Sequence, residues 1–185
     1  NVGRGRPYQR MVSDGISKIH VAFTTGHPRN EKNNSVYYFY YENGACYKAD
    51  GTFIKKWKDL PVIHTEADLV YDGSTNGRAW TWDLAIGTDG NPVVAHGVYP
   101  KENDHRYYYA RWNGAKWSSK EMTRVGRWFP ETPKGAKERE PHYSPGYSFD
   151  HHDPSIVYLS KHIDEDTGQI EVQRWKTQDG GESWT

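Results

Sequence analysis

Imidazole, guanidinium and phenol groups are prominent among the reactive side chains of this chain, which holds 9 histidines and 14 tyrosines. They form the set required for β-elimination from a uronate. In that reaction a cation neutralises the C5 carboxylate, a base removes the C5 proton and an acid protonates the leaving glycosidic oxygen. The candidates for base and acid are His96, His105, His142 and Tyr143. The candidates for substrate binding are His27, Arg29, Arg78, Trp80, Arg106 and Arg111.

The spacing of two histidines suggests where a base would lie. His96 follows the apolar residues 93–95, and His105 opens the next predicted strand. Because the end of one antiparallel strand adjoins the start of the next, both histidines are expected at one end of a sheet. The predicted base is His105 or His96, and the predicted acid is Tyr143 or His142. A loop-anchoring role for the two base candidates is the alternative.

Basic and aromatic residues in three segments could hold an anionic sugar. Arg78, Arg106 or Arg29 is predicted to pair with the carboxylate, because a guanidinium binds a carboxylate through two hydrogen bonds. His27 lies two residues before Arg29 in a polar loop, where it could reach the same anion or only bind the backbone. Trp80 follows Arg78 closely and could stack on a sugar ring, with core packing as the alternative.

Other chemistries find less support in the sequence. Asp83, Asp104 and Glu140 are the candidates for the paired carboxylates of a glycoside hydrolase, although none has a distinctive setting. The His-His-Asp run at 151–153 is predicted to be a solvated turn and not a metal site. The motifs of zinc proteases, paired cysteines, phosphate-binding loops and serine hydrolases do not occur. We therefore expect no cofactor and no catalytic metal, and a structural metal ion is not indicated.

The composition favours an all-β protein. The 185 residues include 24 basic and 24 acidic side chains, so the chain has no charge excess that would attract nucleic acid or an anionic membrane. Aromatic residues make up 15% of the chain, whereas four leucines cannot supply the apolar stripes of a helical bundle. Tyrosine, tryptophan and valine favour strands, and 18 glycines and 10 prolines interrupt them often. The apolar runs are too short to span a membrane.

A repeated pattern divides the chain into three units, at about 1–70, 71–135 and 136–185. Each unit has a polar turn, a short apolar strand, a variable loop and then strands rich in aromatic residues. Asn-Gly and Asp-Gly pairs between apolar segments are strong hairpin signals. Repeated units of three to four antiparallel strands are typical of β-propeller blades, with a β-sandwich as the alternative. The stretch 80–86 is expected to be the innermost strand of the second unit.

The end of the chain resembles a known repeat motif. The segment Thr177-x-Asp179-x-Gly181-x-x-Trp184 fits the Asp-box of bacterial neuraminidase repeats. In such a hairpin the aspartate caps backbone amides, the glycine takes a positive φ and the tryptophan packs beneath the loop. The stretches 23–29, 76–83, 104–112 and 139–144 also resemble the wider family of propeller proteins that contain these repeats.

This resemblance implies both a fold and a set of activities. The family has seven-bladed propellers, and this chain would supply about three to four blades. The rest of a longer chain is therefore expected to complete the ring, with partner chains as the alternative. The family includes ulvan-type polysaccharide lyases, so we expect cleavage of a uronate-containing polysaccharide by elimination. The alternatives are an exo-acting glycoside hydrolase and a non-catalytic glycan-binding propeller. The resemblance also implies a secreted or periplasmic location.

Overall fold

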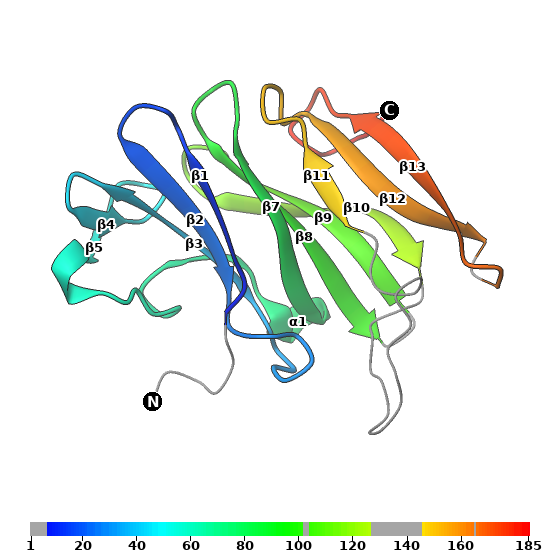
Figure 1. Ribbon diagram of the computed structural model, residues 1–185, viewed down its shortest axis with the longest axis horizontal. Helices are drawn as coiled ribbons and strands as arrows, with labels where there is room; N and C mark the ends of the chain where they lie inside the picture. Colours follow the sequence, from blue (N-terminus) through cyan, green and yellow to red (C-terminus); the bar gives the residue numbers. More distant parts are fainter. Residues whose placement is uncertain (1–6, 102–103, 127–145, 165) are drawn as a thin grey trace.

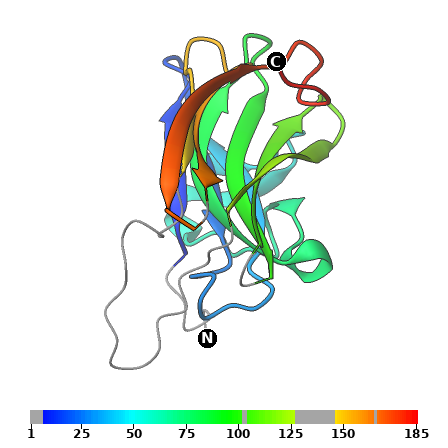
Figure 2. The ribbon, with the colours of Figure 1, turned by 90° about the vertical axis from the view of Figure 1, so that its right-hand side faces the viewer.

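The computed structural model describes residues 7–101, 104–126, 146–164 and 166–185. They form three antiparallel sheets that stand side by side (Figure 1). Viewed from the side of the last sheet, the three sheets lie one behind the other (Figure 2). The prediction of an all-β protein made of propeller blades is confirmed.

The first sheet contains six strands and follows the chain from its inner to its outer edge. Its order is β1-β2-β3-β4-β5. β6 pairs with the first residues of β3, 36–38, and β4 pairs with the last residues of the same strand, 40–42. The strands are β1 (Gln9–Ser13), β2 (Lys18–Thr24), β3 (Val36–Glu42), β4 (Ala45–Tyr47), β5 (Phe53–Lys56) and β6 (Asp68–Tyr71). A short 3-10 helix, Trp57–Asp59, follows β5.

The second and third sheets are simple meanders. The second has the order β10-β9-β8-β7 and the third β11-β12-β13. The strands are β7 (Arg78–Ile86), β8 (Pro92–Lys101), β9 (Asp104–Trp112), β10 (Trp117–Gly126), β11 (Tyr147–Phe149), β12 (Ile156–Asp164) and β13 (Gln169–Lys176). The helix α1 (Gly73–Asn76) joins the first sheet to β7. No helix among the described residues is long and apolar enough to cross a membrane.

The first strand of each sheet lies at the centre of the arrangement. β7 contacts both β1 and β11, so these three strands run next to one another (Figure 1). The prediction that residues 80–86 belong to the innermost strand of their unit is confirmed. A set of sheets whose first strands meet at one axis and whose later strands point outward is the arrangement of propeller blades.

Two layers of buried side chains join the sheets, and both are rich in tyrosine. One layer, between the first and second sheets, includes Tyr38, Tyr71 and Tyr108. The other, between the second and third sheets, includes Tyr107 and Tyr147. The Tyr107 hydroxyl donates to the Ser160 carbonyl oxygen at 3.0 Å, and the Tyr147 hydroxyl donates to the Tyr108 carbonyl oxygen. Buried hydroxyls require such partners, and these bonds also link neighbouring sheets.

The residues of the motif that resembles an Asp-box form a compact loop after β13, which we call the Asp-box loop. Asp179 accepts hydrogen bonds from the amides of Glu182 and Ser183 at 3.0 and 2.9 Å. Gly181 has a φ of 98°, and a Cβ atom at this position would lie 2.6 Å from the Tyr109 ring. The Trp184 ring packs edge-on against Tyr109 at 5.2 Å. The loop therefore fixes the end of the third sheet to the second.

The two ends of the strands must be distinguished to locate the site. We use the word edge for the side of the molecule on which a set of strand ends lies. The side where β7 begins, β8 ends and β9 begins is the α1 edge, since α1 lies there (Figure 1). The opposite edge, which carries the turns at 87–91 and 113–116 and the Asp-box loop, is the hairpin edge.

Candidate functional site

Four of the predicted substrate-binding residues come together at the inner part of the α1 edge. The Arg78 guanidinium donates from Nη1 to the Pro28 carbonyl oxygen at 3.1 Å, which places it beside the loop that carries His27 and Arg29. The His27 ring lies 5.2 Å from the Trp80 ring. We call His27, Arg29, Arg78 and Trp80 the His27–Arg78 cluster. Two sheets contribute to it, the first through the loop after β2 and the second through β7.

Asn34 holds this loop against β7. Its side-chain oxygen accepts from the Gly26 amide at 2.8 Å, and its side-chain nitrogen donates to the Ala79 carbonyl oxygen at 2.7 Å. Its backbone carbonyl accepts from the Ala79 amide at 2.7 Å. Asn34 is completely buried, so these bonds are protected from water. They fix His27 and Arg29 relative to Arg78.

The contacts of His27 define which ring nitrogen carries the proton and can donate a hydrogen bond to a ligand. Its Nδ1 atom accepts from the Arg29 amide at 3.0 Å, so in the neutral ring the proton is on Nε2. Burial, followed by the nearby Arg29 charge, lowers the pKa of His27 below its usual value. The ring is therefore neutral at neutral pH and presents an N–H donor. Such a group can bind a carboxylate or a hydroxyl, but it is poorly suited to remove a proton.

Trp80 is the buried member of the cluster, and its ring does not offer a surface on which a sugar could stack. Its side chain is only 5% exposed. Its ring stacks on Trp82 with 5.3 Å between centroids and packs edge-on against Tyr8 at 5.1 Å. The expectation that Trp80 stacks on a sugar is therefore wrong for this arrangement, and core packing is its role.

The expected meeting of His96 and His105 at one end of a sheet is wrong. β8 does not end at His96 but continues to Lys101, so His96 lies in the middle of the strand, opposite Tyr108. His96 packs against Tyr71 and Tyr108 between the first and second sheets. His105 stacks on Tyr99 at 4.6 Å on the opposite face of the second sheet, near Tyr107.

Burial explains the chemistry of both histidines. His96 is 0% exposed and His105 1% exposed, and burial lowers the pKa of each to about 3. Both rings are neutral at neutral pH, as a general base should be. A polymer at the surface nevertheless cannot touch them, so the geometry favours a structural role. His142 and Tyr143 lie outside the described residues.

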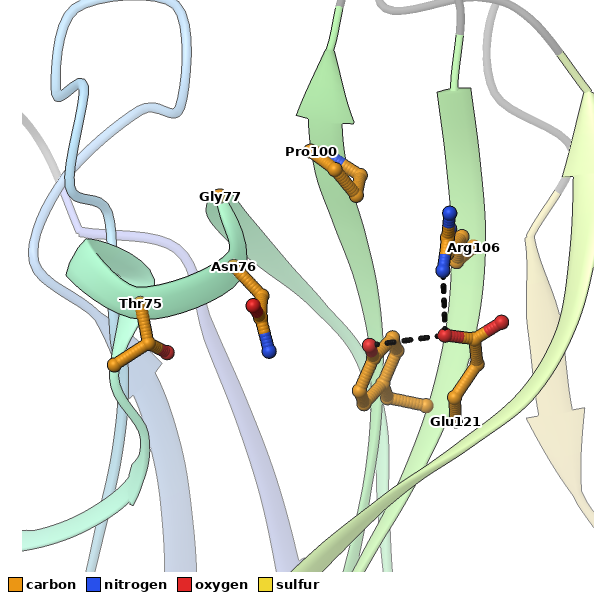
Figure 3. Close-up of a pocket in the computed structure, with 7 residues that line it drawn as sticks. Thr75, Asn76, Gly77, Pro100, Arg106 and Glu121 are labelled. Carbon is orange, nitrogen blue, oxygen red and sulfur yellow. Dashed lines mark hydrogen bonds and ion pairs between the residues drawn. The ribbon is translucent and has the colours of Figure 1, made fainter.

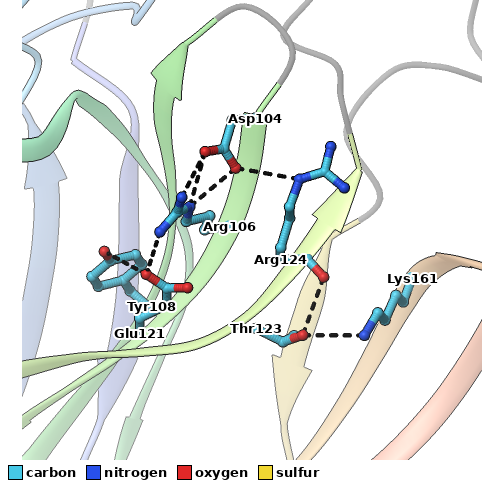
Figure 4. Close-up of polar contacts among 7 residues, drawn as sticks. All are labelled: Asp104, Arg106, Tyr108, Glu121, Thr123, Arg124 and Lys161. Carbon is cyan, nitrogen blue, oxygen red and sulfur yellow. Dashed lines mark hydrogen bonds and ion pairs between the residues drawn. The ribbon is translucent and has the colours of Figure 1, made fainter. Parts of the chain in front are cut away.

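Arg106 lies at the α1 edge, but two carboxylates already bind it. Its guanidinium is 2.7 Å from the Asp104 carboxylate and 2.8 Å from the Glu121 carboxylate (Figure 4). Glu121 also accepts from the Tyr108 hydroxyl at 3.2 Å, and Asp104 lies 3.5 Å from Arg124. The Arg106 hydrogen bond holds the pKa of Asp104 below its usual value. A uronate carboxylate at Arg106 would therefore have to compete with these two carboxylates.

A polar pocket of about 420 Å³ lies beside Arg106, between α1 and strands β8–β10 (Figure 3). Glycine, proline and five polar residues line it: Thr75, Asn76, Gly77, Pro100, Arg106, Tyr108 and Glu121. We call this space the α1 pocket. Gly77 connects it to the His27–Arg78 cluster, because Arg78 is the next residue.

Gly77 holds the two regions close together, and its replacement should be costly. A Cβ atom on Gly77 would lie 2.5 Å from the Tyr99 carbonyl oxygen, and the residue has a φ of 107°. Gly77→Ala is expected to lower the free energy of unfolding by about 3 kcal/mol or more. Gly90→Ala is the control, because Gly90 also has a positive φ but no atom within 4 Å of its Cβ position. Urea unfolding should give about 1 kcal/mol for Gly90→Ala; equal losses would contradict the close approach at Gly77.

Arg111 lies apart from the other predicted binding residues. It is near the end of β9 at the hairpin edge, where it forms an ion pair with Asp89. A second pocket of about 500 Å³ is found there, lined by Arg111, Lys176 and residues of the Asp-box loop. The structure therefore separates Arg111 from the other predicted binding residues, because β9 carries Arg106 and Arg111 to opposite edges.

The predicted carboxylate pair is not assembled among the described residues. Asp83 accepts from the Ser148 hydroxyl at 2.7 Å and from the Phe149 amide at 3.0 Å, so it joins β7 to β11. Asp104 is held by Arg106, and Glu140 lies outside the described residues. The run at 151–153 forms a turn, in which the His152 amide donates to Asp150. The described ranges contain no group of three or more residues that could hold a metal ion.

Sequence reasoning did not identify Asn34, Asn76 or Glu121 as parts of this region. Asn34 is one of several polar residues in the segment 30–35, and nothing in its local sequence marks it as buried. Asn76 lies two residues before Arg78, a predicted binding residue, so its position in the sequence could have indicated that it belongs to the site. Glu121 becomes relevant only through cross-strand pairing with Tyr108, which the sequence does not specify.

Comparison with known proteins agrees with this architecture. A family described as "BNR repeat-containing family member" matches residues 2–125. Among curated proteins, none matches significantly.

Solved structures give matches over nearly the whole chain. A structure described as a polysaccharide lyase of family PL25, an ulvan lyase, is 16% identical, with a TM-score of 0.67 over 97% of this chain and 41% of the other. The same description applies to a structure bound to -[GlcA(1-4)Rha3S]-, with 16% identity and a TM-score of 0.66 over 98% of this chain and 41% of the other. A protein of unknown function from Dyadobacter fermentans is 12% identical, with a TM-score of 0.56 over 98% and 53% of the two chains. The chain thus spans about two fifths of the length of the lyase structures.

Proposed function

Since the chain belongs to the BNR repeat-containing family, we propose that it binds a uronate-containing polysaccharide and that the propeller to which it contributes cleaves this polymer by β-elimination. The observation that carries the proposal is the His27–Arg78 cluster. It brings the Arg78 guanidinium, the loop that carries Arg29 and one neutral N–H donor to the same part of the α1 edge. Two of the structures with a similar fold are described as ulvan lyases, one of them bound to a glucuronate-containing saccharide.

In this proposal the cluster recognises the sugar carboxylate. Arg78 and Arg29 supply positive charge, and the Nε2–H group of His27 donates a hydrogen bond. Neutralising the carboxylate makes the neighbouring C5 proton more acidic, because the charge that develops during its removal is stabilised. Tyr143 or His142 remains the predicted acid. A polymeric substrate also supports a secreted or periplasmic location, with the rest of a longer chain or further chains completing the ring.

A non-catalytic glycan-binding propeller is the second candidate. One observation favours it: the two base candidates, His96 on β8 and His105 on β9, are buried and cannot reach a polymer. In that case the cluster would hold a uronate chain without cleaving it. An exo-acting hydrolase receives less support, because Asp83 and Asp104 are both engaged in structural contacts.

Incubation with ulvan and other uronate polymers separates these functions. Elimination produces unsaturated uronates that absorb ultraviolet light, and hydrolysis produces reducing ends without that absorbance. Retention on an immobilised uronate polymer without either product would indicate binding alone. The absence of retention and of both products would refute the proposal.

Arg78→Gln is expected to weaken binding of a uronate polymer by about tenfold or more, because a charged hydrogen bond to the carboxylate is lost. Isothermal titration calorimetry with uronate oligosaccharides measures the change. Arg174→Gln is the matched control, since Arg174 is an exposed arginine on β13. Equal affinity of the two variants would exclude Arg78 from the site.

A further inference from the structure

We propose that the α1 pocket binds a neutral sugar residue through its hydroxyl groups, next to the uronate held by the His27–Arg78 cluster. The inference rests on the proposed function in one respect, namely that this sugar and the uronate belong to the same polymer. The pocket itself is defined by its own lining residues and can be tested with simple glycosides.

The pocket offers both hydrogen-bond donors and acceptors, which sugar hydroxyls require. Figure 3 shows the Asn76 side chain directed into the space between α1 and β9, on the side of Glu121, and Tyr108 also lines this space. Within the described part of the chain, the Asn76 side chain makes no hydrogen bond, so its amide can both donate to and accept from a ligand. The Thr75 hydroxyl donates to the Asp72 carbonyl oxygen and retains its acceptor capacity.

The charges around the pocket favour a neutral ligand over an acid. Arg106 contributes one positive charge, but Glu121 and Asp104 bind it at 2.8 and 2.7 Å. A carboxylate placed here would approach Glu121 and would have to compete for the same guanidinium. A hydroxyl can instead donate to the carboxylate and accept from the guanidinium without disturbing the ion pair. The guanidinium of the α1 pocket is thus already paired with two carboxylates.

Size and position support the same assignment. The volume of about 420 Å³ lies within the range of small-ligand sites, roughly 300–1,000 Å³. Gly77 lines the pocket, and Arg78, the first residue of β7, belongs to the cluster, so the two regions begin only one residue apart along the chain. A polymer that places a uronate at Arg78 would therefore bring a neighbouring sugar residue to the pocket.

The direct test is a titration of the ¹⁵N-labelled chain with two probes, methyl glucoside and sodium glucuronate. We expect methyl glucoside, or another neutral methyl glycoside, to shift the Asn76 side-chain amide and the Gly77 backbone amide. Asn76→Ala should weaken this binding by at least about tenfold, since a principal donor and acceptor is removed. Gln169→Ala is the control, because it removes an exposed amide from β13. The absence of shifts with all neutral glycosides, or unchanged binding in Asn76→Ala, would overturn the inference.

A second variant tests the role of charge. Glu121→Gln removes one negative charge beside Arg106, so glucuronate is expected to begin to shift the Asn76 side-chain amide. Failure of glucuronate to shift this amide in the variant would contradict the charge argument. Failure of the proposed function is distinguishable, because it would appear as unchanged uronate binding in Arg78→Gln, whatever the neutral glycosides do.

Discussion

Lowering the pH from about 7 to about 5 is expected to reduce the free energy of unfolding by about 6 kcal/mol, because three buried histidines must remain neutral in the folded state. Burial lowers the pKa of His96 and His105 to about 3 and that of His20 to about 4. In the unfolded chain the same groups take up protons near their ordinary value of 6.5.

The sign follows from the number of bound protons. Between about pH 6.5 and 4 the unfolded chain binds more protons than the folded one, so stability falls as the pH falls, by up to about 1.4 kcal/mol per unit and per histidine. Carboxylates with a lowered pKa, such as Asp104, act at lower pH, because their unfolded value is 3.8. The histidines therefore dominate the upper part of the acid range.

Urea unfolding at a series of pH values measures this effect. His96→Phe should reduce the slope of stability against pH by about one proton, whatever its effect on stability itself. His152→Gln is the control, since it removes an exposed histidine. Parallel pH profiles for His96→Phe and the unmodified chain would show that His96 is not buried in its neutral form.

Asn34→Ala is expected to cause the largest combined loss of stability and binding. The change leaves the Gly26 amide and the Ala79 carbonyl without their buried partner, which should lower the free energy of unfolding by about 2–5 kcal/mol. The loop that carries His27 and Arg29 would lose its attachment to β7. We therefore expect uronate affinity to fall to about the level of Arg78→Gln.

Thermal unfolding and calorimetric binding, measured on the same sample below its melting temperature, separate the two effects. Asn30→Ala is the control, because Asn30 is an exposed asparagine of the same loop. A variant that is destabilised but binds normally would show that Asn34 does not position the cluster.

The sequence predicted the architecture well, because strand and turn signals are local. Alternation of apolar and polar residues and the Asp-Gly and Asn-Gly turns indicated the strands of all three sheets. The central position of β7 followed from its place before the first hairpin of its unit. These features depend on neighbouring residues, so a single sequence contains the information needed to recognise them.

The site was harder to predict, because it depends on which face of a strand a residue occupies. His96 and His105 were expected together, but an extra stretch of β8 and the alternation of side chains place them on opposite faces. Arg78 and His27 were predicted separately, and only Asn34 brings their segments together. Contacts between residues 45 positions apart leave no pattern in a single sequence.

The tyrosine hydroxyls that link the sheets have a consequence for how far such repeats can diverge. Tyr107 and Tyr147 each bind a main-chain carbonyl oxygen of the adjacent blade. Every amino acid supplies that oxygen, so substitutions at the receiving position leave the acceptor in place. Neighbouring blades can thus change most of their side chains and keep their mutual alignment, provided that the phenol itself is retained.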